Sequence, residues 1–199
     1  MGKLIVTVSV SLDGYSEGPG GNVMAMQMDS AFDSYCAERL RSADALVLGR
    51  STFQMFSGFW PAVAENPDAS PAQREISRRD NEVQKLVVSD TLSPDDLGAW
   101  LNTTRIVPRA EAQEVISELK RRTIGDLLVF GSRIMWNELL AAGLVDEIHL
   151  ILGSRVVGDG TPAFGSGVLP DLRLLGVRTF EESTNVLLRY AVISGAEAS

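Results

Sequence analysis

Two short segments place glycine, hydroxyl and arginine residues directly after a run of apolar residues. The first, residues 49–52, reads Gly-Arg-Ser-Thr, and the second, residues 131–134, reads Gly-Ser-Arg-Ile. Glycine lets an anion approach the backbone closely, and the free N–H groups at the start of a helix attract negative charge. The two turns are therefore candidate anion sites, and together they could hold a pyrophosphate.

The same residue types also occur in ordinary helix starts, in which a serine or threonine caps the first turn. Neither the Gly-x-Gly-x-x-Gly fingerprint nor the P-loop pattern is present in the chain. A nucleotide held at these turns would need an α/β design other than the two commonest ones.

Cysteine and histidine are almost absent, with Cys36 and His149 as the single examples in 199 residues. One of each excludes a disulfide framework, a thiolate zinc site and a Cys-x-x-Cys redox pair within one chain, and we expect no metal site. Both residues lie in apolar segments and are interpreted as structural. If the protein is an enzyme, an organic cofactor is expected to carry its chemistry.

The overall composition is that of an ordinary globular domain, with 45% hydrophobic and 22% charged residues. A net charge of −8 disfavours nucleic acid and anionic membranes as partners, because both are bound through lysine and arginine. The length favours one domain over residues 1–199, with residues 1–2 and 195–199 as tails. The first apolar run is too short for a signal peptide, so we expect a cytoplasmic protein.

Hydrophobic periodicity predicts an α/β domain. Strands are expected at 4–10, 45–48, 85–88, 103–107, 126–130, 145–152, 173–180 and 186–193, and helices at 29–41, 52–56, 73–79, 111–122 and 133–142. Strands separated by helices predict a mostly parallel sheet with flanking helices, and the final strands predict an antiparallel edge. Ligands of such sheets bind beyond the carboxyl ends of the strands, where both glycine turns are expected.

Several segments occur together in one order along the chain: 8–14 (Val-Ser-Val-Ser-Leu-Asp-Gly), 43–53, 58–61 (Gly-Phe-Trp-Pro), 126–132, 139–148 and 158–164 (Gly-Asp-Gly-Thr-Pro-Ala-Phe). This ordered set resembles the dihydrofolate reductase-like superfamily. It resembles more closely the reductase domain at the C-terminus of the bacterial bifunctional riboflavin-biosynthesis deaminase-reductase. The resemblance runs from about residue 3 to residue 192, and no zinc-deaminase signature precedes it.

The resemblance implies a single-domain mixed sheet of eight strands with NADPH laid across the strand ends. It implies that the two turns contact the phosphates and the nicotinamide side, and that residues after two further strands read the adenosine 2′-phosphate. The residues so implied are Gly49, Arg50, Ser51, Thr52, Ser89, Arg109, Gly131, Ser132, Arg133 and Ile134. Two positions depart from the pattern. Asp90 stands where relatives often carry a cation or a hydroxyl, a difference that concerns the preference for NADPH over NADH. Ser132 replaces the second glycine of a Gly-Gly pair.

Hydride transfer to a heterocyclic C=N bond needs a group that polarises or protonates the acceptor nitrogen, and a carboxyl with a raised pKa can do this. Asp33 resembles the substrate-anchoring acid of dihydrofolate reductases in its position, and Asp13 matches the Leu-Asp-Gly loop of the family. The alternatives are a solvated helix residue and an Asp-Gly turn. Trp60 and Phe164 could cover a flat heterocycle, or could serve core or dimer packing.

These observations favour an NADPH-dependent reductase resembling 5-amino-6-(5-phosphoribosylamino)uracil reductase of riboflavin biosynthesis, acting on a pyrimidine- or pterin-like substrate. Dihydrofolate reduction is one alternative, and a non-catalytic nucleotide-binding dimeric protein is another, because fold does not fix function. The family resemblance also suggests a homodimer, for which the strands at 173–180 and 186–193 are apolar enough.

Overall fold

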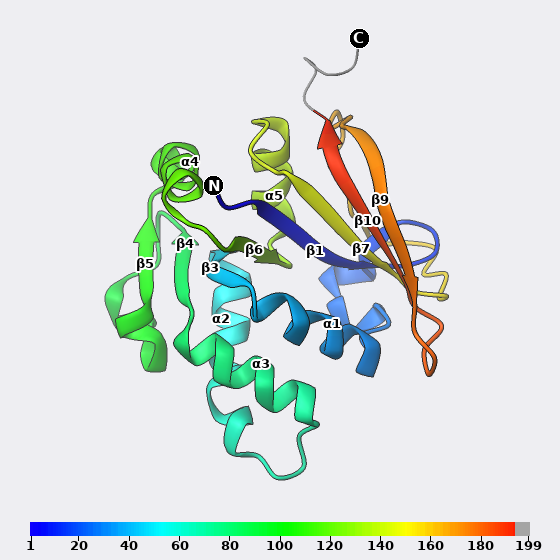
Figure 1. The fold of residues 1–199 in the computed structure, drawn as a ribbon, viewed down its shortest axis with the longest axis horizontal. Coiled ribbons are helices and arrows are strands. Elements are labelled where there is room, and N and C mark those ends of the chain that lie inside the picture. The colour runs from blue at the N-terminus through cyan, green and yellow to red at the C-terminus, as the bar shows by residue number, and fades with distance from the viewer. Residues whose placement is uncertain (194–199) are drawn as a thin grey trace.

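An eight-stranded sheet runs through the whole molecule in the computed structural model, which describes residues 1–193 (Figure 1). This confirms the predicted fold class, and the tail expected at 195–199 lies outside the described residues. From one edge to the other the strands are β5 (Thr104–Val107), β4 (Gln84–Val88), β3 (Ala43–Gly49), β6 (Asp126–Phe130), β1 (Leu4–Val10), β7 (Glu147–Leu152), β10 (Val186–Ile193) and β9 (Asp171–Thr179).

The six strands from β5 to β7 are parallel, and β10 pairs antiparallel with both β7 and β9. The antiparallel edge is therefore where the sequence predicted it. A small second sheet was missed, because β2 (Tyr15–Glu17) and β8 (Thr161–Pro162) are too short to leave a periodic signal. This sheet connects two glycine-rich segments, residues 11–28 and 153–170, in which no strand or helix was predicted.

Helices cover both faces of the sheet (Figure 1). Helices α4 (Ala112–Arg122) and α5 (Arg133–Ala141) lie on one face, and α1 (Ser30–Leu40), α2 (Arg50–Phe59) and α3 (Pro71–Glu82) lie on the other. Short 3₁₀ helices occupy the connections Pro19–Gly21, Val23–Ala25, Trp60–Glu65, Pro94–Asp96, Gly98–Thr103 and Arg109–Glu111.

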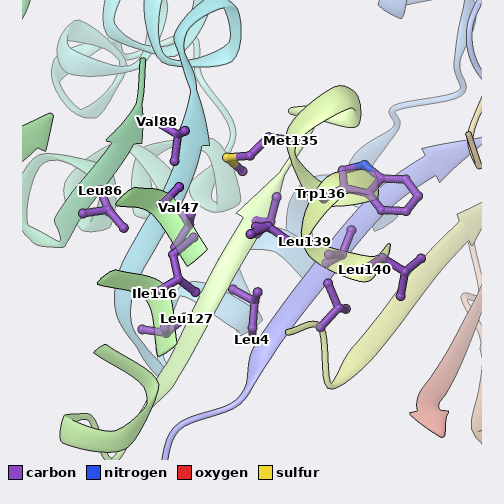
Figure 2. Close-up of a cluster of buried hydrophobic side chains, with 14 of the residues drawn as sticks. Leu4, Val47, Leu86, Val88, Ile116, Leu127, Met135, Trp136, Leu139 and Leu140 are labelled. Atoms are coloured by element: carbon purple, nitrogen blue, oxygen red, sulfur yellow. The ribbon is translucent and has the colours of Figure 1, made fainter. Parts of the chain in front are cut away.

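Strand β6 shows why the sheet has two apolar faces. Leu127 and Val129 pack with α4 and α5, whereas Leu128 and Phe130 pack with α1, α2 and α3, because successive side chains of a strand point to opposite faces. Figure 2 shows the first of these clusters, in which Trp136 of α5 is fully buried. Each such large apolar side chain contributes about 2 kcal/mol through removal from water.

Some boundaries differ from those predicted. Helix α3 begins at Pro71 rather than at residue 73, because Ser70 and Gln73 form a capping box with two hydrogen bonds of 3.1 Å. Helix α2 continues through Gly58 to Phe59. The expected tail at residues 1–2 is shorter, since Gly2 is buried and its amide donates to backbone carbonyls of the α4 end at 3.0 Å.

His149 forms a buried polar chain between β7 and α1. Its Nδ1 lies 2.8 Å from the Tyr35 hydroxyl and its Nε2 lies 2.9 Å from Glu147, whose other oxygen accepts from Lys3 at 2.5 Å. The imidazole is fully buried, and Cys36 is buried on α1. These contacts confirm the structural interpretation of His149.

Candidate functional site

The carboxyl ends of three neighbouring strands meet at one end of the sheet. Strands β4, β3 and β6 are adjacent, and they end at Val88, Gly49 and Phe130. A cleft of about 600 Å³ opens there. This volume lies within the usual range of about 300 to 1,000 Å³ for small-molecule sites.

The cleft gathers almost every residue that the family resemblance implied for the cofactor. Gly131 does not line the cleft. The other nine do: Gly49, Arg50, Ser51, Thr52, Ser89, Arg109, Ser132, Arg133 and Ile134. Sequence reasoning missed several other lining residues: Glu17, Thr91, Met135, Glu138 and Thr161. Glu17 and Thr161 come from the small β2–β8 sheet, which had no signal in the sequence.

Hydrogen bonds fasten the two glycine turns to each other. The Ser132 amide donates to the Thr52 hydroxyl at 3.0 Å, and the Gly49 amide donates to the Ser132 hydroxyl at 2.9 Å. Gly131 has a φ of 57°, and a Cβ there would approach Thr52 to 3.2 Å. The backbone of the second turn is thus held close against α2, and a side chain at position 131 would be strained and crowded against Thr52.

Ser132 adopts the same left-handed conformation that a glycine would adopt at its position. Its φ is 53° and its ψ is 41°. This conformation costs a non-glycine residue about 1 kcal/mol or more, and here the hydroxyl bond to Gly49 offsets the strain. The departure from a Gly-Gly pair therefore places a non-glycine residue in a left-handed conformation and adds a side-chain link to Gly49.

Two helices begin at the cleft with exposed backbone donors. No side chain caps α2 or α5, and neither helix carries an acidic residue in its first turn. Their first N–H groups thus remain available, and they carry the positive end of each helix dipole. The cleft can therefore bind anionic groups through main-chain donors alone.

Three arginines and three acidic residues share the cleft. Arg50 donates to the Thr91 hydroxyl at 3.0 Å, and Arg133 donates to the Pro162 carbonyl of β8. The Arg109 guanidinium lies 3.9 Å from both Asp90 and Glu138. Glu17 is the third acidic residue, so the formal charge of the cleft sums to zero. An anion would therefore be attracted by individual arginines and helix starts and not by a net positive charge of the cleft.

A second pocket of about 40 Å³ lies between α1, α2, α3 and the end of β6. Asp33 and Trp60, which were predicted on the substrate side, both line it. Trp60 packs edge-on against Phe56, with ring centroids 6.4 Å apart. Thr52 of the cleft and Phe56 of this pocket lie one turn apart on α2, so the same helix contributes to both spaces.

The two candidate acids have different environments. Asp33 is half-buried, and burial raises its pKa, while a 2.9 Å hydrogen bond from Gln73 opposes that rise. Asp13 is exposed, and its bonds to the Ser11 hydroxyl and the amides of Gly158 and Val157 lower its pKa to about 2. A carboxyl that stays ionised is a poor proton donor, so the geometry favours Asp33 and makes Asp13 an anchor of the glycine-rich loop.

Phe164 lies away from Trp60. It packs edge-on against Trp136 of α5 at a centroid distance of 5.6 Å and lines neither pocket. Phe164 therefore has the core-packing role that was the alternative to substrate contact. Trp60 and Phe164 do not line one common substrate site.

Asp80 is a residue of the second pocket that sequence reasoning missed. It lies on α3, whose apolar residues are too few to show which face is buried. Ile76, Ser77 and Asp80 nevertheless share the buried face at helical spacing. The helical spacing of these residues is visible in the sequence, but two of the three are polar, so the sequence does not identify them as a buried face.

The sequence profile of the family described as RibD C-terminal domain matches residues 2–186. The chain belongs to this family. A relative from Bacillus subtilis, the uncharacterized protein YyaP, is 27% identical over 181 residues and covers 89% of each chain.

Solved structures share the fold of this RibD C-terminal domain protein. A putative riboflavin biosynthesis protein from Shewanella sp. PV-4 matches with a TM-score of 0.69 and 20% identity, covering 96% of this chain and 99% of that one. A deaminase/5-amino-6-(5-phosphoribosylamino)uracil reductase from Thermotoga maritima matches at 0.66 and 14%, covering 96% and 57%. Dihydrofolate reductase from Enterococcus faecalis, complexed with NADP(H), matches at 0.59 and 12%, covering 96% and 97%. These likenesses confirm the dihydrofolate reductase-like fold.

Within residues 1–193, no helix combines the length and the apolar character needed to cross a bilayer. The same described residues contain no cluster of three or more histidine, cysteine, aspartate or glutamate side chains suited to a metal ion.

Proposed function

We propose that the protein is an NADPH-dependent reductase of the riboflavin-pathway type, which transfers a hydride to a pyrimidine- or pterin-like heterocycle. The observation that carries this proposal is the cleft at the ends of β3, β4 and β6. It brings together two uncapped helix starts, two fastened glycine turns and three arginines. Family membership supports the reaction class.

The donor set fits a dinucleotide phosphate. The N–H groups that begin α2 and α5 would hold the pyrophosphate, and Gly49 and Gly131 leave the room that a side chain would fill. Ser89 and Arg109 would hold the 2′-phosphate, and Arg50 would contact the cofactor's phosphates beside the first turn. NADPH, when bound, supplies the hydride that the chain's own residues lack.

Asp90 bears on the choice between NADPH and NADH. Its carboxylate accepts the Arg109 backbone amide at 2.9 Å and also lies near the guanidinium of that residue. The negative charge is thus partly balanced within the chain, while Arg50 lies beside Thr91 on the same side of the cleft. This arrangement supports NADPH, and we expect NADH to bind more weakly.

The second pocket would receive the reactive ring of the substrate. It shares helix α2 with the cleft, Trp60 and Phe56 offer apolar ring surfaces, and Asp33 lies in its wall. Because burial raises the pKa of Asp33, this carboxyl can orient the ring and hold a proton for the acceptor nitrogen. A substrate such as 5-amino-6-(5-phosphoribosylamino)uracil suits this division, with its phosphate directed to solvent or to the arginines.

A homodimer and a cytoplasmic location remain predictions. The edge strand β9 exposes Leu174, Leu175 and Val177, with 52%, 38% and 57% of each residue accessible. Apolar side chains on an exposed strand edge favour pairing with a second chain, so we propose that β9 contributes to the dimer contact.

Cofactor binding tests the proposal. The melting temperature should rise with NADPH and rise less with NADH, and absorbance should show NADPH oxidation when the uracil substrate is added. Arg50→Ala should weaken NADPH binding by about tenfold, the usual value of a lost charge-assisted contact. Arg121→Ala removes an exposed charge of α4 outside the cleft and should leave affinity unchanged. Equal NADPH affinity in wild type and Arg50→Ala would overturn the site assignment.

A further inference from the structure

Asp80 is a carboxyl of the second pocket that the proposed reaction leaves unused. It is 1% exposed, and neither of its carboxylate oxygens has a hydrogen-bond partner within the described chain. A buried carboxyl without a partner is costly, because it loses hydration and gains nothing in return. Such a group in a cavity wall is satisfied by donors from outside the chain or by a proton.

Two nearby side chains with N–H donors bond to other acceptors. The Lys85 ammonium donates to the Val83 carbonyl at 2.8 Å and to the Thr103 hydroxyl at 3.1 Å, and it lies 4.5 Å above the Trp100 ring. The Gln73 amide nitrogen donates to Asp33 at 2.9 Å. Lys85 therefore moderates the charge of Asp80 from a distance without bonding to it.

The other lining residues of the pocket indicate what kind of group could contact Asp80. Its wall is largely aromatic and apolar, with Phe32, Phe56, Trp60 and Phe130. The volume of about 40 Å³ exceeds the roughly 10 to 15 Å³ that one water needs, so the pocket has room for a polar group of a ligand. Ionised carboxyls in an aromatic wall accept hydrogen bonds from N–H donors and repel anionic edges.

We propose that Asp80 is a specificity-determining residue, which accepts hydrogen bonds from an amino or ring N–H group of a planar nitrogen heterocycle held in this pocket. The heterocycle is the hydride acceptor, and in that respect the inference rests on the proposed function. Asp33 and Asp80 then recognise different parts of a donor-rich ring. Burial, which raises the pKa of Asp80 to about 7, also makes the carboxyl receptive to a ligand that restores its lost hydrogen bonds.

Matched fragments test this contact. The probes are 2,4-diaminopyrimidine and 2,4-dimethylpyrimidine, which share a shape but differ in N–H donors, and their dissociation constants are measured by ligand-observed NMR. We expect wild type to bind the diamino ring at least about tenfold more tightly than the dimethyl ring. Asp80→Asn should lose most of this preference, whereas Asp95→Asn, which changes an exposed carboxyl outside the pocket, should keep it. Equal binding of the two probes to wild type, or an unchanged preference in Asp80→Asn, would overturn the proposal.

Two further arms keep the result decisive. If Asp80→Asn does not fold, Asp33→Asn replaces it: a preference that survives there must come from Asp80, and a preference that disappears overturns the inference. NADPH binding is measured on the same samples. NADPH binding without fragment discrimination would refute the role of Asp80 alone, whereas discrimination without NADPH binding would refute the proposed reductase.

Discussion

Replacing Asp80 by asparagine should flatten the dependence of stability on pH. Burial raises the pKa of Asp80 from 3.8 to about 7, and the more distant Lys85 ammonium only partly opposes this. The folded protein therefore holds the Asp80 proton more tightly than the unfolded chain does. Stability from this group is fully present below about pH 4 and is lost as the pH rises through 7.

The size of the effect follows from that pKa. Each pH unit between the two pKa values corresponds to about 1.4 kcal/mol, so the whole span costs about 4 kcal/mol. Between pH 5 and pH 7 the loss is about 2 kcal/mol, because half of the folded carboxyls are still protonated at pH 7. Lys85 adds little in this range, since its pKa, lowered by burial to about 8, leaves it largely protonated.

Urea unfolding at pH 5 and pH 7 measures the difference. Wild type should lose about 2 kcal/mol more unfolding free energy between the two pH values than Asp80→Asn does. Asp95→Asn, which changes an exposed carboxyl of a 3₁₀ helix, serves as the control and should follow wild type. If wild type and Asp80→Asn change in parallel, the carboxyl is ionised and paired in the folded state, and the reasoning about an unpartnered Asp80 is refuted.

Three shorter predictions concern other contacts. Ser132→Ala should destabilise the protein by about 1 kcal/mol relative to Ser132→Gly in calorimetry, because both lose the bond to Gly49 and alanine alone keeps the left-handed strain. The bond to His149, with help from Lys3, holds the pKa of Glu147 at about 2, so wild type should lose stability in an acid titration as the pH falls from 4.5 toward 2. Glu147→Gln should not show this loss. Val177→Lys on β9 should convert a dimer to a monomer in light scattering, and a wild type that is already monomeric would refute the edge contact.

Much of the fold was predictable because the strands are short, continuous apolar runs. Leu127, Leu128 and Val129 are apolar on both faces, as a strand covered by helices on each side requires. The capping box of Ser70 and Gln73 was also readable and would have placed the start of α3 correctly. The β2–β8 pair was not predictable, since three residues against two carry no periodicity.

The two sites differ in how visible they are from the sequence. The cleft is built from residues just after strands, so strand ends and glycines were sufficient to locate it. The second pocket depends on tertiary packing, because Asp80 of α3 faces α1 only after both helices have docked on the sheet. A polar residue on a polar helix gives no sign of burial until its neighbours are placed.

Helix α2 ties the two sites into one unit. Its first turn supplies Thr52, which holds the Ser132 amide at the cleft, and its next turn supplies Phe56 to the pocket. Between them Phe53 is fully buried in the core, so the helix cannot shift at one site without shifting at the other. A cofactor that orders the start of α2 would therefore also fix the aromatic wall against which a heterocycle lies. This arrangement gives a physical reason to expect that cofactor and ring bind with mutual support.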